Sequence, residues 1–154
     1  MIKIKLAGPK DFKTVRTTYK ESFKEYADSE QFHYFFNFIN KDRIKNKEVL
    51  LAYDGKKPVG ICTFELKSMI FSRAAYLDNI AVVREYRKKG VGGLLFDKFL
   101  RLARAKGVRR VFSNTWPSNE ASINFHKKLG FKYCGKIEKA SDEKEAYIFF
   151  SKKL

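Results

Sequence analysis

The chain has 154 residues, of which 44% are hydrophobic and 16% aromatic. This length fits a single domain with a buried core, and this composition excludes a disordered chain. The formal net charge of +16 would attract polyanions such as nucleic acid or a phosphate-rich cofactor. Because the basic residues are spread over nearly every segment, a solvated basic surface is the simpler interpretation.

No targeting or membrane segment is visible. The N-terminal residues alternate apolar and basic side chains, and no stretch approaches the ~20 apolar residues of a membrane helix. Cys62 and Cys134 stand singly in strand-like segments, and we expect them to be buried free thiols. Together with two histidines they form no ligand cluster for zinc. We therefore expect a cytoplasmic protein without a structural metal.

The predicted elements begin with a strand at residues 1–6, where apolar and basic residues alternate. A helix follows from Asp11, which can cap it, to about Tyr26. A second helical segment runs from Gln31 to about Lys45. The chain thus opens with one strand and two helices.

Three strands come next. Residues 49–53 form a buried strand, Asp54-Gly55 is a strong hairpin-turn signal, and the return strand covers residues 59–66. A loop around residues 68–72 leads to a long strand at residues 74–83. These connections predict an antiparallel meander.

Helices and strands alternate in the second half. The remaining elements are an amphipathic helix that ends at Gly107, a strand at 108–114, a helix from Ser118 or Asn119 to Gly130, and strands at 131–137 and 146–151. A meander followed by crossover units implies an α/β (α+β) fold, with a mixed sheet and helices on both of its faces.

The segment between the strand at 74–83 and the following helix carries the chemistry. It reads Arg87-Lys88-Lys89-Gly90-Val91-Gly92-Gly93. Its backbone N–H groups lie where the helix dipole is positive, a geometry that holds a pyrophosphate. Glycine at 90 and 92 removes the β-carbons that would keep phosphate oxygens from the backbone. Arg87, Lys88 and Lys89 add charge for the anion.

Two other phosphate loops are excluded. A Walker loop needs Lys-Ser/Thr after its last glycine, whereas Gly92 is followed by Gly93-Leu94. A dinucleotide fingerprint that starts at Gly90 needs glycine or alanine at position 95, which is Leu95. The segment fits neither pattern.

The remaining pattern, R-x-x-G-x-G after a strand that ends Ile80-Ala81-Val82, resembles the acetyl-CoA pyrophosphate loop of the GNAT superfamily of N-acyltransferases. A second stretch, NEASINFHKKLGF from Asn119 to Phe131, resembles the family's second signature: an asparagine, a small-apolar helix, an aromatic proton donor and Leu-Gly-Phe. The resemblance covers essentially the whole chain and is strongest from Tyr76 to Phe131.

This resemblance implies one domain over residues 1–154, with a mixed, mostly antiparallel central sheet of about seven strands. It also implies an enzyme without a metal that transfers the acetyl group of acetyl-CoA to a primary amine. In the family, both substrates bind together and the amine attacks the thioester directly.

The resemblance assigns cofactor-binding residues beyond the loop. It places the pantetheine arm along Ile80-Ala81-Val82, where a backbone N–H would also stabilise the developing oxyanion. It places Asn119, Phe125 and His126 with the cofactor as well. For Asn119, a plain helix N-cap is the alternative role.

His126 departs from the tyrosine that many family members use to protonate the departing CoA thiolate. Histidine can serve, because an unperturbed imidazole is roughly a quarter protonated at pH 7 and its cation is a stronger acid than a thiol. Some small-molecule acetyltransferases resemble this chain in carrying histidine here. The alternative is a histidine that only packs near the cofactor.

The general base is predicted to be Asp78, near the middle of the strand that leads to the cofactor edge. Glu65 on the neighbouring strand is the alternative, and Asp78 could also act through water. Many relatives carry glutamate where this chain has Asn114, which cannot act as a base.

The acceptor is expected to be the amine of a small molecule, or a protein N-terminus or lysine; His126 favours the small molecule. Neither the length of the acyl group nor a homodimer follows from these residues. Two other functions remain open. One is a catalytically weak acyl-CoA-binding or regulatory module, suggested by the departures at positions 114 and 126. The other is a basic nucleic-acid- or ribosome-associated protein, suggested by the net charge.

Overall fold

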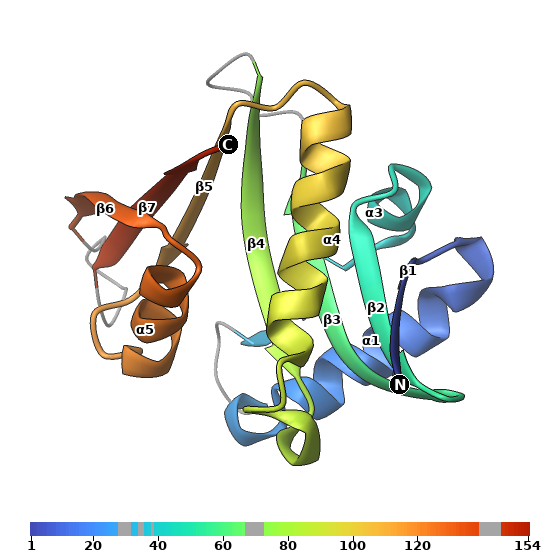
Figure 1. The fold of residues 1–154 in the computed structure, drawn as a ribbon. Helices are drawn as coiled ribbons and strands as arrows, with labels where there is room; N and C mark the ends of the chain where they lie inside the picture. Colours follow the sequence, from blue (N-terminus) through green and yellow to red (C-terminus); the bar gives the residue numbers. More distant parts are fainter. Residues whose placement is uncertain (28–31, 34–35, 38, 67–72, 139–145) are drawn as a thin grey trace. The chain divides into compact units, whose positions relative to one another are not determined.

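Seven strands form one sheet in the order β1-β2-β3-β4-β5-β7-β6 (Figure 1). The computed structural model describes residues 1–27, 32–33, 36–37, 39–66, 73–138 and 146–154. The strands are β1 (Ile2–Leu6), β2 (Val49–Asp54), β3 (Lys57–Glu65), β4 (Ala74–Val82), β5 (Arg110–Thr115), β6 (Lys132–Ile137) and β7 (Tyr147–Lys153). The pairs β1–β2, β2–β3, β5–β7 and β6–β7 are antiparallel, and β4–β5 is parallel. The predicted mixed, mostly antiparallel sheet is confirmed.

The chain divides into two compact units. Unit 1 comprises residues 1–64 and 79–102, and unit 2 comprises residues 65–78 and 103–154. β4 passes from unit 2 into unit 1. The α-helices with described bounds are α1 (Phe12–Ser22), α3 (Lys41–Lys45), α4 (Val91–Ala105) and α5 (Glu120–Lys128).

The first predicted helix is shorter than expected. α1 ends at Ser22, because Phe23 adopts φ −116° and ψ 21°, and a 3-10 turn, η2 (Lys24–Tyr26), follows. Asp11 does not cap α1 as predicted. Its carboxylate accepts a hydrogen bond from the Gly8 N–H at 2.8 Å and so closes the preceding turn, η1 (Pro9–Asp11).

The predicted helix from Gln31 to Lys45 is interrupted. Asn40 is extended, with φ −113° and ψ 176°, and its side chain accepts a hydrogen bond from the Arg43 N–H at 3.1 Å. Asparagine in this geometry starts a new helix, here α3. Part of the predicted helix, and the predicted loop around 68–72, lie outside the described residues.

In unit 1, helices cover both faces of the strands. Val15 and Tyr19 of α1 belong to one buried cluster with Leu51 of β2 and Ile61 of β3. On the opposite face α4 crosses β3 (Figure 1), and a β-carbon added to Gly60 would lie 3.3 Å from Leu95. Because side chains alternate along β3, the two helices pack on opposite faces. The prediction of helices on both faces is confirmed in this unit.

In unit 2, β7 pairs with both β5 and β6, and α5 packs onto β7 through His126, whose ring stacks on Phe150. β6 stands at the end of the strand order, and Cys134 on it is exposed. The prediction of a buried thiol at Cys134 is therefore wrong, because nearly every residue of β6 is exposed and little packs on this strand. Cys62 in unit 1 is buried, and both thiols are free.

The apolar face of α4 allows a matched test of this packing. Leu95 is fully buried, whereas its neighbour Leu94 is 45% exposed. Leu95→Ala should lower the free energy of unfolding by about 2–5 kcal/mol, because it leaves a cavity against β3. Leu94→Ala should change it by less than about 1 kcal/mol. Urea unfolding of both variants checks the orientation of α4, and equal losses would contradict it.

Candidate active site

The loop between β4 and α4 reverses the backbone through two residues of positive φ, Lys88 (59°) and Gly90 (83°). A 3-10 turn, η3 (Arg84–Tyr86), starts this reversal. The Leu94 N–H donates to the Gly90 carbonyl at 3.1 Å and closes the first turn of α4. Glycine at position 90 makes this entry into the helix possible without strain.

The first turn of α4 contains Val91, Gly92 and Gly93, which the sequence pattern had placed in the loop. Their N–H groups precede the first helical hydrogen bond, so they have no acceptor within the helix. A β-carbon at Gly90 or Gly93 would have no described atom within 4 Å, so the described residues leave space beside these two glycines. Open N–H groups at the positive end of a 15-residue helix suit an anion.

Two exposed lysines of the loop, Lys88 and Lys89, carry positive charge beside this turn. The Lys89 ammonium lies 5.5 Å from the centre of the Tyr86 ring. The Tyr86 hydroxyl donates to Asp54 at 3.1 Å, and this hydrogen bond raises the pKa of the Tyr86 phenol. Tyr86 is thereby held in place as a platform for Lys89.

Arg87, the third cation predicted to bind the cofactor, is bonded within unit 1. Its Nε donates to the Val82 carbonyl at 3.0 Å, and one terminal nitrogen donates to the Ser22 carbonyl at 2.9 Å. The other terminal nitrogen forms an ion pair with Glu25. The guanidinium thus ties the loop to the end of β4 and to the end of α1.

The three residues predicted to meet the pantetheine arm form the end of β4. Ala81 is buried in the core cluster of unit 1, whereas Ile80 and Val82 are partly exposed. The Val83 N–H that follows donates to Val59 of β3 at 3.0 Å. The Ala81 side chain therefore has a packing role. The backbone groups of Ile80, Ala81 and Val82 stay candidates for hydrogen bonds to the pantetheine arm.

In unit 2, both predicted base candidates lie near one tyrosine. The Tyr76 hydroxyl donates to the Asn114 side-chain oxygen at 2.6 Å. Burial raises the pKa of Tyr76, and the negative charges of Asp78 and Glu65 raise it further. The Tyr76 hydroxyl is thus bonded to Asn114, and the charges of Asp78 and Glu65 act on it.

Asn119 caps α5, because its side-chain oxygen accepts a hydrogen bond from the Ser122 N–H at 3.1 Å. Asn119 therefore has the N-cap role that was the alternative to cofactor binding. Its side-chain amide nitrogen is the group that could donate a hydrogen bond to a cofactor. Phe125 on the same helix is half-buried.

His126 is 6% exposed, and both of its ring nitrogens contact protein groups. Nε2 lies 2.8 Å from the Ser113 hydroxyl, and Nδ1 lies 2.7 Å from the Ser122 carbonyl. Burial lowers the pKa of His126, and the contact with the Ser122 carbonyl partly offsets this effect. Both ring nitrogens are therefore occupied by protein groups.

The sequence analysis missed the partners that hold these residues. Ser113 is 2% exposed and contacts His126, and a polar residue at an inward position of a strand was its available signal. Ser22 and Glu25 hold Arg87, but they precede it by more than sixty residues, so no local pattern indicated them.

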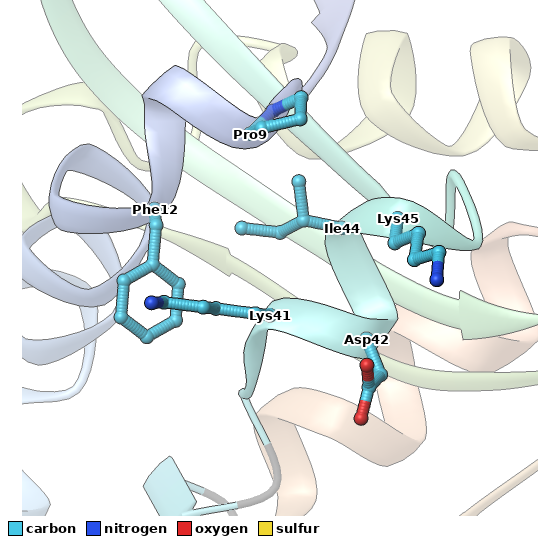
Figure 2. Close-up of a pocket in the computed structure, with 6 residues that line it drawn as sticks. All are labelled: Pro9, Phe12, Lys41, Asp42, Ile44 and Lys45. Atoms are coloured by element: carbon cyan, nitrogen blue, oxygen red, sulfur yellow. The ribbon is translucent and has the colours of Figure 1, made fainter.

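A separate pocket of about 220 Å³ lies in unit 1, apart from the predicted residues (Figure 2). It is lined by Pro9, Phe12, Lys41, Asp42, Ile44 and Lys45. Among the described residues, no group of three or more His, Cys, Asp or Glu side chains could hold a metal ion. Within the same ranges, none of the helices has the length and apolar character that a membrane span requires.

The chain matches one family model and is similar to several known proteins. The family model described as the acetyltransferase (GNAT) family matches residues 12–131. GCN5-related N-acetyltransferase 7, a chloroplastic protein of Arabidopsis thaliana, is 36% identical over 78 residues, which span 51% of this chain and 26% of that protein.

Solved structures share the fold. The PaiA N-acetyltransferase of Thermoplasma acidophilum, determined in complex with coenzyme A, has a TM-score of 0.79 at 20% identity over 100% of this chain and 99% of that one. The ribosomal-protein-alanine N-acetyltransferase of Brucella melitensis has a TM-score of 0.76 at 19% identity over 99% of both chains.

The lowered pKa of His126 predicts a pH dependence of stability. Between the folded pKa and 6.5, the unfolded chain binds more protons than the folded chain. The free energy of unfolding should therefore fall as the pH decreases through this window, by at most about 1.4 kcal/mol per pH unit. Urea unfolding at several pH values should show a shallower slope in His126→Gln. An unchanged slope in His126→Gln would refute the assignment.

Proposed function

The chain belongs to the acetyltransferase (GNAT) family, and we propose that it transfers the acetyl group of acetyl-CoA to a primary amine by direct attack while both substrates are bound. The match to the Arabidopsis protein spans only 26% of that protein. The observation that carries the proposal is the start of α4. Open N–H groups follow a glycine of positive φ and stand beside two exposed lysines.

These residues fit a pyrophosphate. The N–H groups of Val91, Gly92 and Gly93 would donate to its oxygens, and Lys88 and Lys89 would balance its charge. Arg87 would act indirectly, because its bonds to Ser22 and Val82 hold the loop in shape. The backbone of Ile80, Ala81 and Val82 is the proposed partner of the pantetheine amides.

Acetyl-CoA supplies the thioester carbonyl that the amine attacks. The amine must first lose a proton, and we assign this step to Asp78, directly or through water, with Glu65 as the alternative. Both carboxylates lie near Tyr76, whose hydroxyl is held by Asn114. A backbone N–H at the end of β4 would stabilise the negative charge on the carbonyl oxygen.

His126 is the proposed proton source for the CoA thiolate, with Asn119 and Phe125 as further cofactor contacts from α5. Burial makes the imidazolium a stronger acid by lowering its pKa, although less of it is present at pH 7.

The proposed acceptor is the amine of a small molecule. A protein N-terminus is the alternative, because the Brucella melitensis neighbour is named as a ribosomal-protein-alanine N-acetyltransferase. A cytoplasmic location stays a prediction of the sequence.

Isothermal titration of acetyl-CoA tests the loop. Gly90→Glu and Gly92→Glu should weaken binding more than about tenfold, because each places a carboxylate against the phosphates. Gly107→Glu is the matched control for Gly90→Glu, since Gly107 has φ 74° beyond the other end of α4 and a side chain there causes similar backbone strain. Equal weakening by all three variants, or wild-type protein that does not bind, would contradict the proposed loop.

The base is tested once an acceptor has been found in an amine screen. Asp78→Asn should lower kcat/KM by about 10²–10⁴-fold, because the amide cannot accept the proton. Glu65→Gln should have a smaller effect, and Asp97→Asn on the exposed surface of α4 is the control. A larger loss in Glu65→Gln would move the base to Glu65.

A further inference from the structure

A chain of hydrogen bonds runs through His126 inside unit 2. The Ser113 hydroxyl donates to the Leu77 carbonyl at 2.9 Å, and His126 Nε2 lies 2.8 Å from the same hydroxyl oxygen. At the other side of the ring, Nδ1 lies 2.7 Å from the Ser122 carbonyl. The chain therefore ends at each side in a main-chain carbonyl, which can accept a proton but cannot donate one.

Three contacts of this length need three protons. Ser113 supplies one, and a neutral imidazole supplies one more. With that proton on Nε2, the lone pair of Nδ1 faces the Ser122 carbonyl oxygen, and the Ser122 hydroxyl is a longer contact at 3.3 Å. With the proton on Nδ1, Ser113 must turn from Leu77 to Nε2. The imidazolium, with protons on both nitrogens, makes all three bonds at once.

The surroundings of the ring oppose its charge. Phe150 of β7 stacks on it at a centroid distance of 4.7 Å, and Phe131 meets it edge-on at 5.2 Å. The other side chains at the ring are Ser113 of β5 and Ser122 of its own helix. On the same face, Lys152 of β7 lies two residues from Phe150, and a β-carbon added to Gly130 at the end of α5 would lie 2.9 Å from the Lys152 ammonium. Tyr133 of β6, which can titrate, meets the Phe150 ring edge-on at 6.4 Å. A lysine cation on this face disfavours a second positive charge on the ring. Hydrogen bonds are therefore the interactions that support a proton on this ring.

Ser113 also joins two strands where their backbone pairing stops. The parallel register of β4 and β5 covers Ala74 to Tyr76 on β4, opposite Arg110 to Phe112 on β5. The next contact along the strands is the Ser113 side chain on the Leu77 carbonyl. The same hydroxyl thus touches His126 and the residue that precedes Asp78.

We propose that Ser113 is a positioning residue that holds His126 in its proton-donating form and takes over the bond to Nε2 after the proton has left. This inference rests on the proposed role of His126 as the proton source. A hydroxyl can do both, because it accepts from the imidazolium while it donates to Leu77 and can then turn to donate to the bare nitrogen. In that step the Nε2–H bond breaks, the thiolate gains the proton, and the histidine keeps its Nδ1 proton.

The test does not depend on activity. The chain has two histidines, so a protein labelled with ¹⁵N-histidine gives two imidazoles, and His33→Gln assigns the remaining one to His126. Long-range ¹H–¹⁵N spectra over a pH titration report the pKa and the tautomer of His126. The neutral form of the wild type should carry its proton on Nδ1. A proton on Nε2 would overturn the proposal without any variant of Ser113.

The variants of Ser113 give the second readout. Ser113→Ala should move the His126 pKa downward by about one, because a hydrogen bond to a charged group is stronger than one to its neutral form. Ser113→Thr, which restores a hydroxyl, should return it towards the wild-type value. Ser151→Ala is the matched control, since Ser151 is also buried in unit 2 but bonds to Arg110. An unchanged or raised pKa in Ser113→Ala would refute the proposal.

Kinetics separate this inference from the proposed function. With an amine that the enzyme acetylates, the pH profile of kcat can be measured. Its alkaline limb should lie at a lower pH in Ser113→Ala than in the wild type, and the KM for acetyl-CoA should be unchanged. A kcat profile that does not move, while the NMR titration does, would show that the bond exists but does not serve the reaction. If no amine is acetylated, the proposed function fails, and the titration still decides whether Ser113 controls His126.

Discussion

The close approach of α4 to β3 is the constraint on which the proposed phosphate site depends. Gly60 lies under the helix, where an added β-carbon would come within 3.1 Å of the Ala81 carbonyl and 3.4 Å of Val91. The carbonyl belongs to the neighbouring strand β4, and the helix contributes the Leu95 and Val91 side chains at 3.3 and 3.4 Å, so glycine relieves crowding from both β4 and α4. Because Val91 and Leu95 are buried at this contact, the rotation of α4 is set from its first turn. The N–H groups at its start are then aimed by packing rather than by the loop alone.

The net charge of +16 has local consequences that a count of charges does not reveal. Arg87 lies in the most basic part of the loop, yet its guanidinium donates hydrogen bonds to Glu25 and to two main-chain carbonyls. Lys88 and Lys89 keep their charges in solvent. Adjacent cations in one motif therefore divide into one that builds the loop and two that can meet an anion. Guanidinium suits the first role, because its planar fork reaches several acceptors at once.

Unit 2 builds its candidate chemistry around buried polar groups instead of exposed charge. Tyr76 is held by Asn114, and His126 is held by Ser113 and Ser122. In a poorly solvated interior each of these hydrogen bonds is stronger than in water, and each unmade one is costly. The protonation of His126 is for this reason linked to the hydroxyl orientation of Ser113, and through it to the backbone of β4.

The sequence by itself determined the elements whose signals are local. Alternation, the Asp54-Gly55 turn and the apolar stripe of α4 predicted the strands in their order along the chain and the main helix. The glycines at 90 and 92, together with the stretch from Asn119 to Phe131, indicated the family. Tertiary structure decided the breaks at Ser22 and Asn40, the partners of Arg87 and the placement of Ser113 beside His126. The physical reason is range. Periodicity and turn chemistry act between neighbours in the chain, whereas a hydrogen-bond partner is chosen by which distant segments the packing of the core brings within 3 Å.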